Sequence, residues 1–121
     1  MKYKCMKIVS SLSEEHLFDS VQDLRINTES GIIEVIMADS RFIMLFDRLK
    51  YFEVFFESPQ SADVKYSRGL ISLSSGLPAT AIEQVINFDW KAEQGLFMVF
   101  AKNSTIGIHL DHLVSFKLEN H

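Results

Sequence analysis

The chain lacks most features that mark secreted, membrane-bound or disulfide-stabilised proteins. Cys5 is the only cysteine, which excludes an internal disulfide and a metal site built from cysteines. The longest apolar runs, residues 42–46 and 96–101, are far too short to span a bilayer. Lysines interrupt the apolar residues near the N-terminus, so the sequence predicts no signal peptide. We therefore expect a cytoplasmic protein that does not enter a membrane.

Positive charge is also scarce. The chain has 12 Lys and Arg against 16 Asp and Glu, a net charge of −4, and the basic residues form no stripe. Binding to a nucleic-acid backbone needs clustered Lys and Arg, so the sequence argues against a nucleic-acid partner. A basic protein partner fits better, because complementary charge speeds and specifies association.

Apolar residues are abundant. Hydrophobic residues make up 47% of the chain and charged residues 23%, which is typical of a globular protein. A chain of 121 residues is long enough to bury a core and has the size of one domain. We therefore expect a single domain over residues 1–121.

One short pattern, D-x-L-x-x-F, occurs twice, at residues 47–52 and 111–116. Aligning the chain with itself at an offset of 64 needs no gaps and gives eight identical pairs between residues 18 and 53. Ordinary residue usage would give roughly two. The sequence therefore predicts an internal duplication, with repeats 1–57 and 65–121 and a linker at 58–64, although two unrelated β-meanders would share part of this pattern.

Each repeat predicts a strand, a short helix and four further strands. Residues 2–10 and 65–74 alternate as strands do. Ser13 has the chemistry of an N-cap and predicts a helix over residues 13–22. In the second repeat Pro78 suits a first helical position. The apolar residues that follow it recur at helical spacing, at Ile82, Val85 and Ile86.

We therefore expect an α+β fold, rich in β-structure and mostly antiparallel, in which the repeats are related by a pseudo-twofold axis around one shared core. The D-x-L-x-x-F pattern is expected to form a corner in each repeat. Its Asp would cap backbone amides of the turn, and its Leu and Phe would fill the core on either side.

Three residues near the second corner, His109, Asp111 and His112, are the best metal candidates. Metal sites need three or four convergent ligands with further support. The Asp recurs in the first repeat, where Leu45 and Arg48 replace the two histidines. This favours a structural Asp beside two surface histidines, and we predict no metal site.

No catalytic signature stands out. His16 with Asp19 and Glu14 could serve in acid–base chemistry, but carboxylates at a helix start are commoner as partners of the helix dipole. No Ser or Cys nucleophile lies in a strand–turn–helix context. We predict a protein that is not an enzyme and needs no cofactor.

The repeats differ on the face opposite their expected core. There the first repeat has four apolar residues, Ile43, Leu45, Tyr51 and Phe55, and the second has Gly107, His109, Ser115 and Glu119. Carboxylates surround the apolar set in the sequence, at Glu34, Asp39, Glu53 and Glu57. Aromatic anchors with a charged rim are typical of a protein interface, so these eight residues are the candidate partner-binding set. The alternative is that a helix or the N-terminal strand covers this face within the chain.

The stretch "HLFDSVQDLRI", with Phe18, Asp19 and Ser20, resembles the small β-rich immunity proteins of bacterial polymorphic-toxin and contact-dependent inhibition systems. The likeness covers residues 16–57. It implies a noncatalytic protein that binds and blocks one toxin domain, often a basic nuclease, through a negative surface. A different class of function also stays open, namely a self-associating adaptor that forms a homodimer through the 43–55 face.

Overall fold

A computed structural model describes residues 3–74 and 79–120. The first repeat contains β1 (Tyr3–Ser10), β2 (Glu15–Val21), β3 (Asp23–Asn27), β4 (Ile32–Ile36), β5 (Arg41–Leu45), the single 3-10 turn η1 (Phe46–Arg48) and β6 (Leu49–Phe55). The second contains β7 (Tyr66–Leu73), β8 (Thr80–Lys91), η2 (Ala92–Gln94), β9 (Leu96–Ala101), β10 (Ser104–His109), η3 (Leu110–His112) and β11 (Leu113–Glu119).

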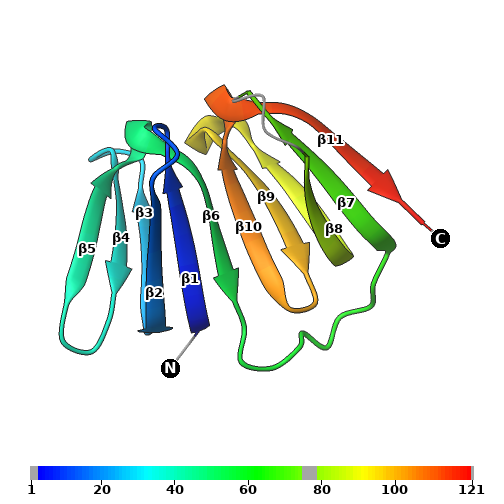
Figure 1. The fold of residues 1–121 in the computed structure, drawn as a ribbon, viewed down its shortest axis with the longest axis horizontal. Helices are drawn as coiled ribbons and strands as arrows, with labels where there is room; N and C mark the ends of the chain where they lie inside the picture. The colour runs from blue at the N-terminus through cyan, green and yellow to red at the C-terminus, as the bar shows by residue number, and fades with distance from the viewer. Residues whose placement is uncertain (1–2, 75–78, 121) are drawn as a thin grey trace.

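The strands form two antiparallel sheets (Figure 1). The larger has eight strands in the order β11-β7-β8-β9-β10-β6-β1-β2, and the smaller has three in the order β3-β4-β5. The expected antiparallel, β-rich character is confirmed. The expected α+β class is wrong, because the only helical elements in the described ranges are three single 3-10 turns.

Both expected helices are strands. Residues 15–21 form β2 and residues 80–91 form β8, whereas Pro78 lies outside the described residues. Each of these strands contains a residue with a left-handed φ at the same place in its repeat, Ser20 with φ 56° and Gln84 with φ 55°.

Such a residue breaks the alternation of a strand. In β2 Phe18 packs against the core and Val21, three positions on, is fully buried. In β8 the buried residues Ile82 and Val85 have the same spacing. A spacing of three is what an amphipathic helix shows, so in β8 the left-handed residue made a strand resemble a helix. The helix over residues 13–22 was predicted instead from the N-cap chemistry of Ser13.

Element boundaries recur 64 residues apart in the structure. η1 and β6 have the same bounds as η3 and β11 after this shift. Gly31 and Gly95 both have a left-handed φ, of 71° and 70°. The amide of Phe46 donates to the carbonyl of Gly31 at 2.8 Å, and Leu110 donates to Gly95 at 3.0 Å. Each corner is therefore held by an equivalent hydrogen bond.

The corner residues divide into two groups. Leu49 and Phe52 are completely buried, as the motif predicts for core residues. The Asp is different, because Asp47 is exposed and its side chain gives no cap to η1 in the described structure. In η3 the amide of Asp111 donates instead to the ring of His109, at 3.2 Å from Nδ1.

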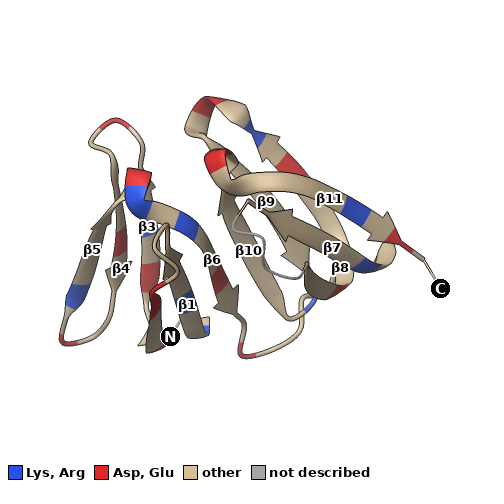
Figure 2. Cartoon of the chain, turned by 45° about the horizontal axis from the view of Figure 1, so that its top comes forward, with Lys and Arg blue, Asp and Glu red and all other residues tan. Residues whose placement is uncertain are grey.

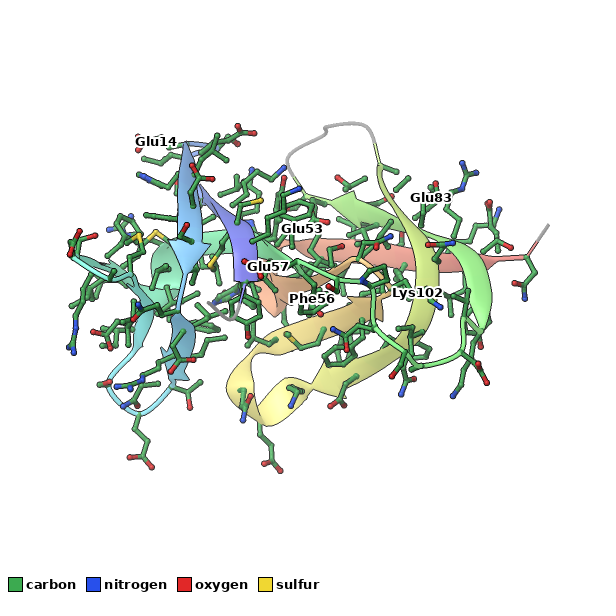
Figure 3. All side chains as sticks on the ribbon, turned by 90° about the horizontal axis from the view of Figure 1, so that it is seen from below. Glu14, Glu53, Phe56, Glu57, Glu83 and Lys102 are labelled. Carbon is green, nitrogen blue, oxygen red and sulfur yellow. The ribbon has the colours of Figure 1, made fainter. Side chains whose placement is uncertain are left out.

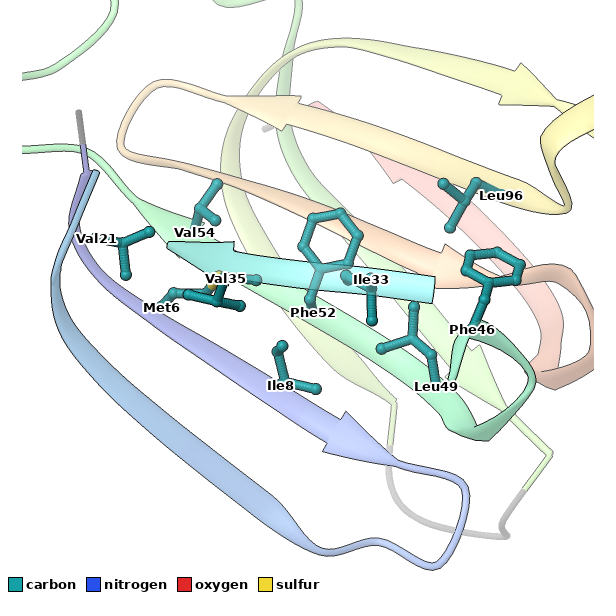
Figure 4. Packing of buried hydrophobic residues seen from close by; sticks show 10 residues of the cluster. All are labelled: Met6, Ile8, Val21, Ile33, Val35, Phe46, Leu49, Phe52, Val54 and Leu96. Carbon is teal, nitrogen blue, oxygen red and sulfur yellow. The ribbon is translucent and has the colours of Figure 1, made fainter. Parts of the chain in front are cut away.

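The buried apolar residues form two clusters rather than the one shared core that we expected. The first lies within the first repeat, joined by one residue of the second repeat, and comprises Met6, Ile8, Val21, Ile33, Val35, Phe46, Leu49, Phe52, Val54 and Leu96 (Figure 4). The second comprises Ile71, Ile82, Val85, Phe97, Val99, Ala101, Ile106 and Ile108. Each repeat thus packs its own core, and the eight-stranded sheet runs through both.

Strands of the two repeats pair with each other at one place in the described residues, where β10 of the second repeat pairs with β6 of the first. A twofold axis would also pair the equivalent strands, β5 with β11. These two strands instead lie at opposite ends of the molecule (Figure 1). The expected pseudo-twofold arrangement is therefore wrong, and the repeats are arranged head to tail.

Candidate functional site

The eight candidate partner-binding residues lie on two surfaces. Ile43, Leu45 and Glu34 belong to the three-stranded sheet, and Asp39 lies in the turn between β4 and β5. The other four lie on or just after β6, in the eight-stranded sheet, at Tyr51, Glu53, Phe55 and Glu57. The corner at η1 takes the chain from one sheet to the other, so alternation along β5 and β6 does not place their side chains on one face.

The second of these surfaces is the outer side of β6, β1 and β2. Directly opposite residues of antiparallel strands point to the same side of a sheet. Phe55 lies opposite Cys5, which lies opposite Asp19, and Glu53 lies opposite Lys7, which lies opposite Leu17. We call this surface the β6 face: Tyr51, Glu53, Phe55, Cys5, Lys7, Leu17 and Asp19.

A hollow of about 280 Å³ opens on the β6 face, with Phe55, Leu17, Cys5 and Asp19 among its walls. The Leu17 side chain is 73% exposed in the middle of a strand. Glu15 on the same strand is exposed as well, and Glu57 follows β6. The β6 face therefore combines an apolar hollow with several carboxylates.

The charges at the centre of the β6 face are partly shielded from water. Burial raises the pKa of Glu53, and this rise is opposed by a hydrogen bond from the Ser104 hydroxyl, 3.1 Å from Oε2, and by the positive charge of Lys7. The Lys7 ammonium lies 5.4 Å from the centre of the Tyr51 ring. Tyr51 also packs against the second core cluster, which gives it a structural role.

Acidic and basic residues are both spread over the molecule rather than separated by sign into two regions (Figure 2). Figure 3, viewed from below, places Glu53 and Glu57 near the middle of the molecule. These two carboxylates therefore lie beside the junction of the two repeats and not at either end.

A larger cavity, of about 540 Å³, lies on the opposite side of the same sheet, between the repeats. Its walls are mainly apolar and include Leu24 and Ile26 of β3, Phe52 of β6, and Met98 and Phe100 of β9. It holds few polar groups that could orient or transform a ligand. Most of the residues that line it come from the first repeat and from β9, where these two parts of the chain pack against each other.

The metal candidates lie around η3. His109 is buried beneath Phe46, with ring centres 4.8 Å apart, and its Nδ1 accepts the amide of Asp111. His112 lies at the end of the turn, with its Nδ1 3.4 Å from the hydroxyl of Ser74. Across residues 3–74 and 79–120, no three His, Cys, Asp or Glu side chains converge as metal ligands would.

The contact between Ser74 and His112 is the nearest approach to a nucleophile–base pair. Removal from water lowers the pKa of His112, as do the charges of His109 and Lys50. A catalytic pair of this kind needs a third group that orients the base and donors for an oxyanion. Asp111, the nearest carboxylate in sequence, contacts His109 instead, at 3.8 Å.

Sequence reasoning missed Leu17, Lys7 and Lys50. Leu17 was assigned to a helix, although its place between polar neighbours also fits an alternating strand. Lys50 is only 2% exposed, and its ammonium donates to the Ser13 hydroxyl at 2.7 Å. Nothing in the sequence distinguishes this lysine from an exposed one.

Among the helical elements of the described residues, none is long and apolar enough to span a membrane. Comparisons with protein-family models, with curated proteins and with solved structures found no match to this chain.

Proposed function

We propose that the chain is a noncatalytic protein of the bacterial cytoplasm that binds a protein partner through the β6 face. In its specific form, the proposal is that the partner is a basic toxin domain and that the chain acts as its immunity protein. The observation that carries the proposal is the hollow between Phe55 and Leu17, an open and mainly apolar site with Asp19 and Lys7 in its wall and further carboxylates on the same strands or just after them.

The chemistry of this surface fits a partner that inserts an apolar or aromatic side chain and brings positive charge around it. Interface energy concentrates in a few residues that fill pockets, and surrounding charges act mainly on association rate and specificity. The exposed carboxylates of Asp19, Glu15 and Glu57 are placed for the second role. Phe55 and Leu17 are placed for the first.

The test uses the immobilised chain as bait in lysate of the native host, with the variants Phe55→Ala and Leu17→Asp beside the wild type. A specific partner should be retained by the wild type and lost from both variants. Ile43→Ala is the matched control, because it removes an apolar side chain from a different surface. Melting temperatures of all baits show whether any loss comes from unfolding.

The purified partner then allows affinities to be measured. Phe55→Ala should weaken binding by about 1–3 kcal/mol, with little change in melting temperature. Glu57→Lys should mainly slow association, and the effect should shrink as salt is added. Unchanged affinity for both Phe55→Ala and Leu17→Asp would show that the β6 face is not the binding surface.

The proposed immunity function is tested by a separate measurement. Cells that produce the partner alone should stop growing, and co-production of the wild-type chain should restore growth, whereas Leu17→Asp should not. A partner that has no effect on growth would contradict the immunity function and leave only the binding function.

A further inference from the structure

The junction between the repeats is a pairing of two strands that occupy different positions in their repeats. β10 is the fifth strand of its repeat by correspondence with β5, and β6 is the last strand of the first repeat. Their register places Gly107 opposite Phe52 and Ile108 opposite Tyr51. All six residues of β10 are buried at this inner joint.

The strand equivalent to each of these two is an edge strand, with one side unpaired in the described chain. β5 corresponds to β10, and β11 corresponds to β6, each 64 residues away. β5 is an edge of the three-stranded sheet, β11 is an edge of the eight-stranded sheet, and neither pairs with a further strand of the described chain. They lie too far apart to pair within one molecule, at its two ends (Figure 1).

These two edges carry exposed apolar side chains. Three large ones lie on them, namely Ile43 (57% exposed), Leu45 (58%) and Val114 (65%). The corresponding residues at the inner joint are Gly107, His109 and Lys50, all of which are buried. Natural edge strands usually avoid such apolar side chains or interrupt them with charge or proline. The two edges thus expose apolar side chains that a free edge strand usually lacks.

The register of the inner joint can be transferred to the two edges. Shifted by 64 residues, the pair Gly107 and Phe52 becomes Ile43 and Phe116. The joint ends at Ile108 opposite Tyr51, which becomes Met44 opposite Ser115, so Leu45 and Val114 are the next residues of the two strands. Two of the most exposed apolar side chains of the edges therefore come near each other at the end of the transferred joint.

The transferred register must also accommodate Ile43 where the inner joint has a glycine. A Cβ at Gly107 would overlap the Phe52 ring, which lies over that glycine. Phe116 lies over Gly69 of β7 instead, on the side away from the open edge, with its Cε1 2.9 Å from where a Cβ would stand. The space opposite Phe116 is therefore left open for a larger residue such as Ile43.

We propose that β5 of one molecule pairs antiparallel with β11 of a second copy of this chain, and so repeats the inner joint between molecules. The joint is head to tail, so the assembly closes into a ring if the rotation per molecule allows it and otherwise extends as a filament. No residue of the β6 face belongs to β5 or β11, so this inference is independent of the proposed partner site.

The first experiment measures molecular mass by size-exclusion chromatography with light scattering, over a range of protein concentration. The wild-type chain should form species whose mass is a multiple of 13.9 kDa. Leu45→Asp and Val114→Asp should each reduce the mass to that of one chain. Leu12→Asp is the matched control, because Leu12 is as exposed but lies in the turn after β1, and this variant should assemble like the wild type.

The second experiment mixes the two single variants in equal amounts. Leu45→Asp keeps an intact β11, and Val114→Asp keeps an intact β5. The two altered edges repel each other because both carry an Asp, so the mixture can form one wild-type joint and no more. The expected product is a species of two chains. Its formation also shows that both variants are folded.

Three results would overturn the proposal. One is a wild-type chain that keeps the mass of a single chain at every concentration. Another is a mixture of the two variants that forms no two-chain species. The third is a Val114→Asp variant that still assembles on its own, because β5 would then pair with another β5.

Discussion

β10 and β5 hold the same position in the two repeats, yet one is buried along its whole length and the other is exposed at every second residue. The difference lies in what adjoins them. β10 has β6 on one side and β9 on the other, whereas β5 has only β4. The inner joint has small and polar residues because two strands pack closely there. The larger apolar residues of β5 are exposed, so an apolar pattern alone does not identify core residues.

The largest expected effect compares the two corner phenylalanines. Phe52→Ala should cost about 3–5 kcal/mol of unfolding free energy, because the ring is completely buried at the inner joint. Phe116→Ala should cost clearly less, because its strand is an edge and the ring is only partly buried. Urea unfolding of both variants at one protein concentration measures the difference. Equal costs would mean that the two corners are packed alike.

A smaller effect is expected at the glycine beneath Phe52. Gly107→Ala should cost about 1–3 kcal/mol, because the new methyl group forces the Phe52 ring or the Met98 sulfur to move. Gly69→Ala is the matched control and should cost less, since Phe116 can shift toward the open edge. Combining Gly107→Ala with Phe52→Leu should cost less than the sum of the two changes. Additive costs in urea unfolding would contradict the direct contact.

The buried lysine gives a third prediction. Ser13→Gly should cost about 1 kcal/mol, because it removes the hydroxyl that accepts from the Lys50 ammonium. Glycine is chosen because Ser13 has a left-handed φ of 66°, which alanine would adopt at a further cost.

A double-mutant cycle supplies the control for this effect. With Lys50→Met already in place, Ser13→Gly should cause little further loss in thermal or urea unfolding. An unchanged loss in that background would show that the hydroxyl acts through some other contact.

The smallest expected effect concerns pH. The pKa of His112 in the folded chain is lowered below its ordinary value of 6.5, chiefly by removal from water. The unfolded chain therefore takes up a proton at a pH at which the folded chain does not. The stability that His112 contributes is present above the unfolded pKa and is lost as the pH falls through it.

His112→Gln should accordingly flatten the dependence of melting temperature on pH between pH 8 and pH 5. Glu53 acts in the opposite direction, because burial raises its pKa and stability grows as the pH falls through that raised value. Glu53→Gln is therefore the matched control with the opposite sign. A His112→Gln curve parallel to that of the wild type would contradict the lowered pKa.

Local pattern was enough to predict part of this fold. The alternation at residues 2–10 and 65–74 places β1 and β7 almost to the residue, because a half-buried strand leaves a period of two in its sequence. The corner residues Leu49 and Phe52 were likewise predicted as core residues, because apolar residues repeated beside a turn usually pack into the core.

The rest depended on information that the local pattern does not carry. Ser20 and Gln84 reverse the sign of φ within a strand, which neither residue type announces, and in β8 this produces the spacing from which a helix was predicted. The other helix was predicted from Ser13, whose hydroxyl instead accepts a hydrogen bond from Lys50. The candidate interface was split because the corner at Phe46 separates two sheets. One of the two strands that pair with β6 lies in the other repeat. Periodicity within a strand does not show which distant strand it pairs with.

The inner joint also orders events during synthesis. Glu53 and Ser104, which meet across it, are 51 positions apart, so β6 is made well before β10 exists. At ordinary translation speeds this gap lasts roughly 3–10 s. During that time the first repeat has β1 available to pair one side of β6, while its other side stays unpaired on the ribosome. The second repeat, once made, then serves the nascent chain as its own intramolecular chaperone, because its arrival covers the strand edge that the first repeat left open.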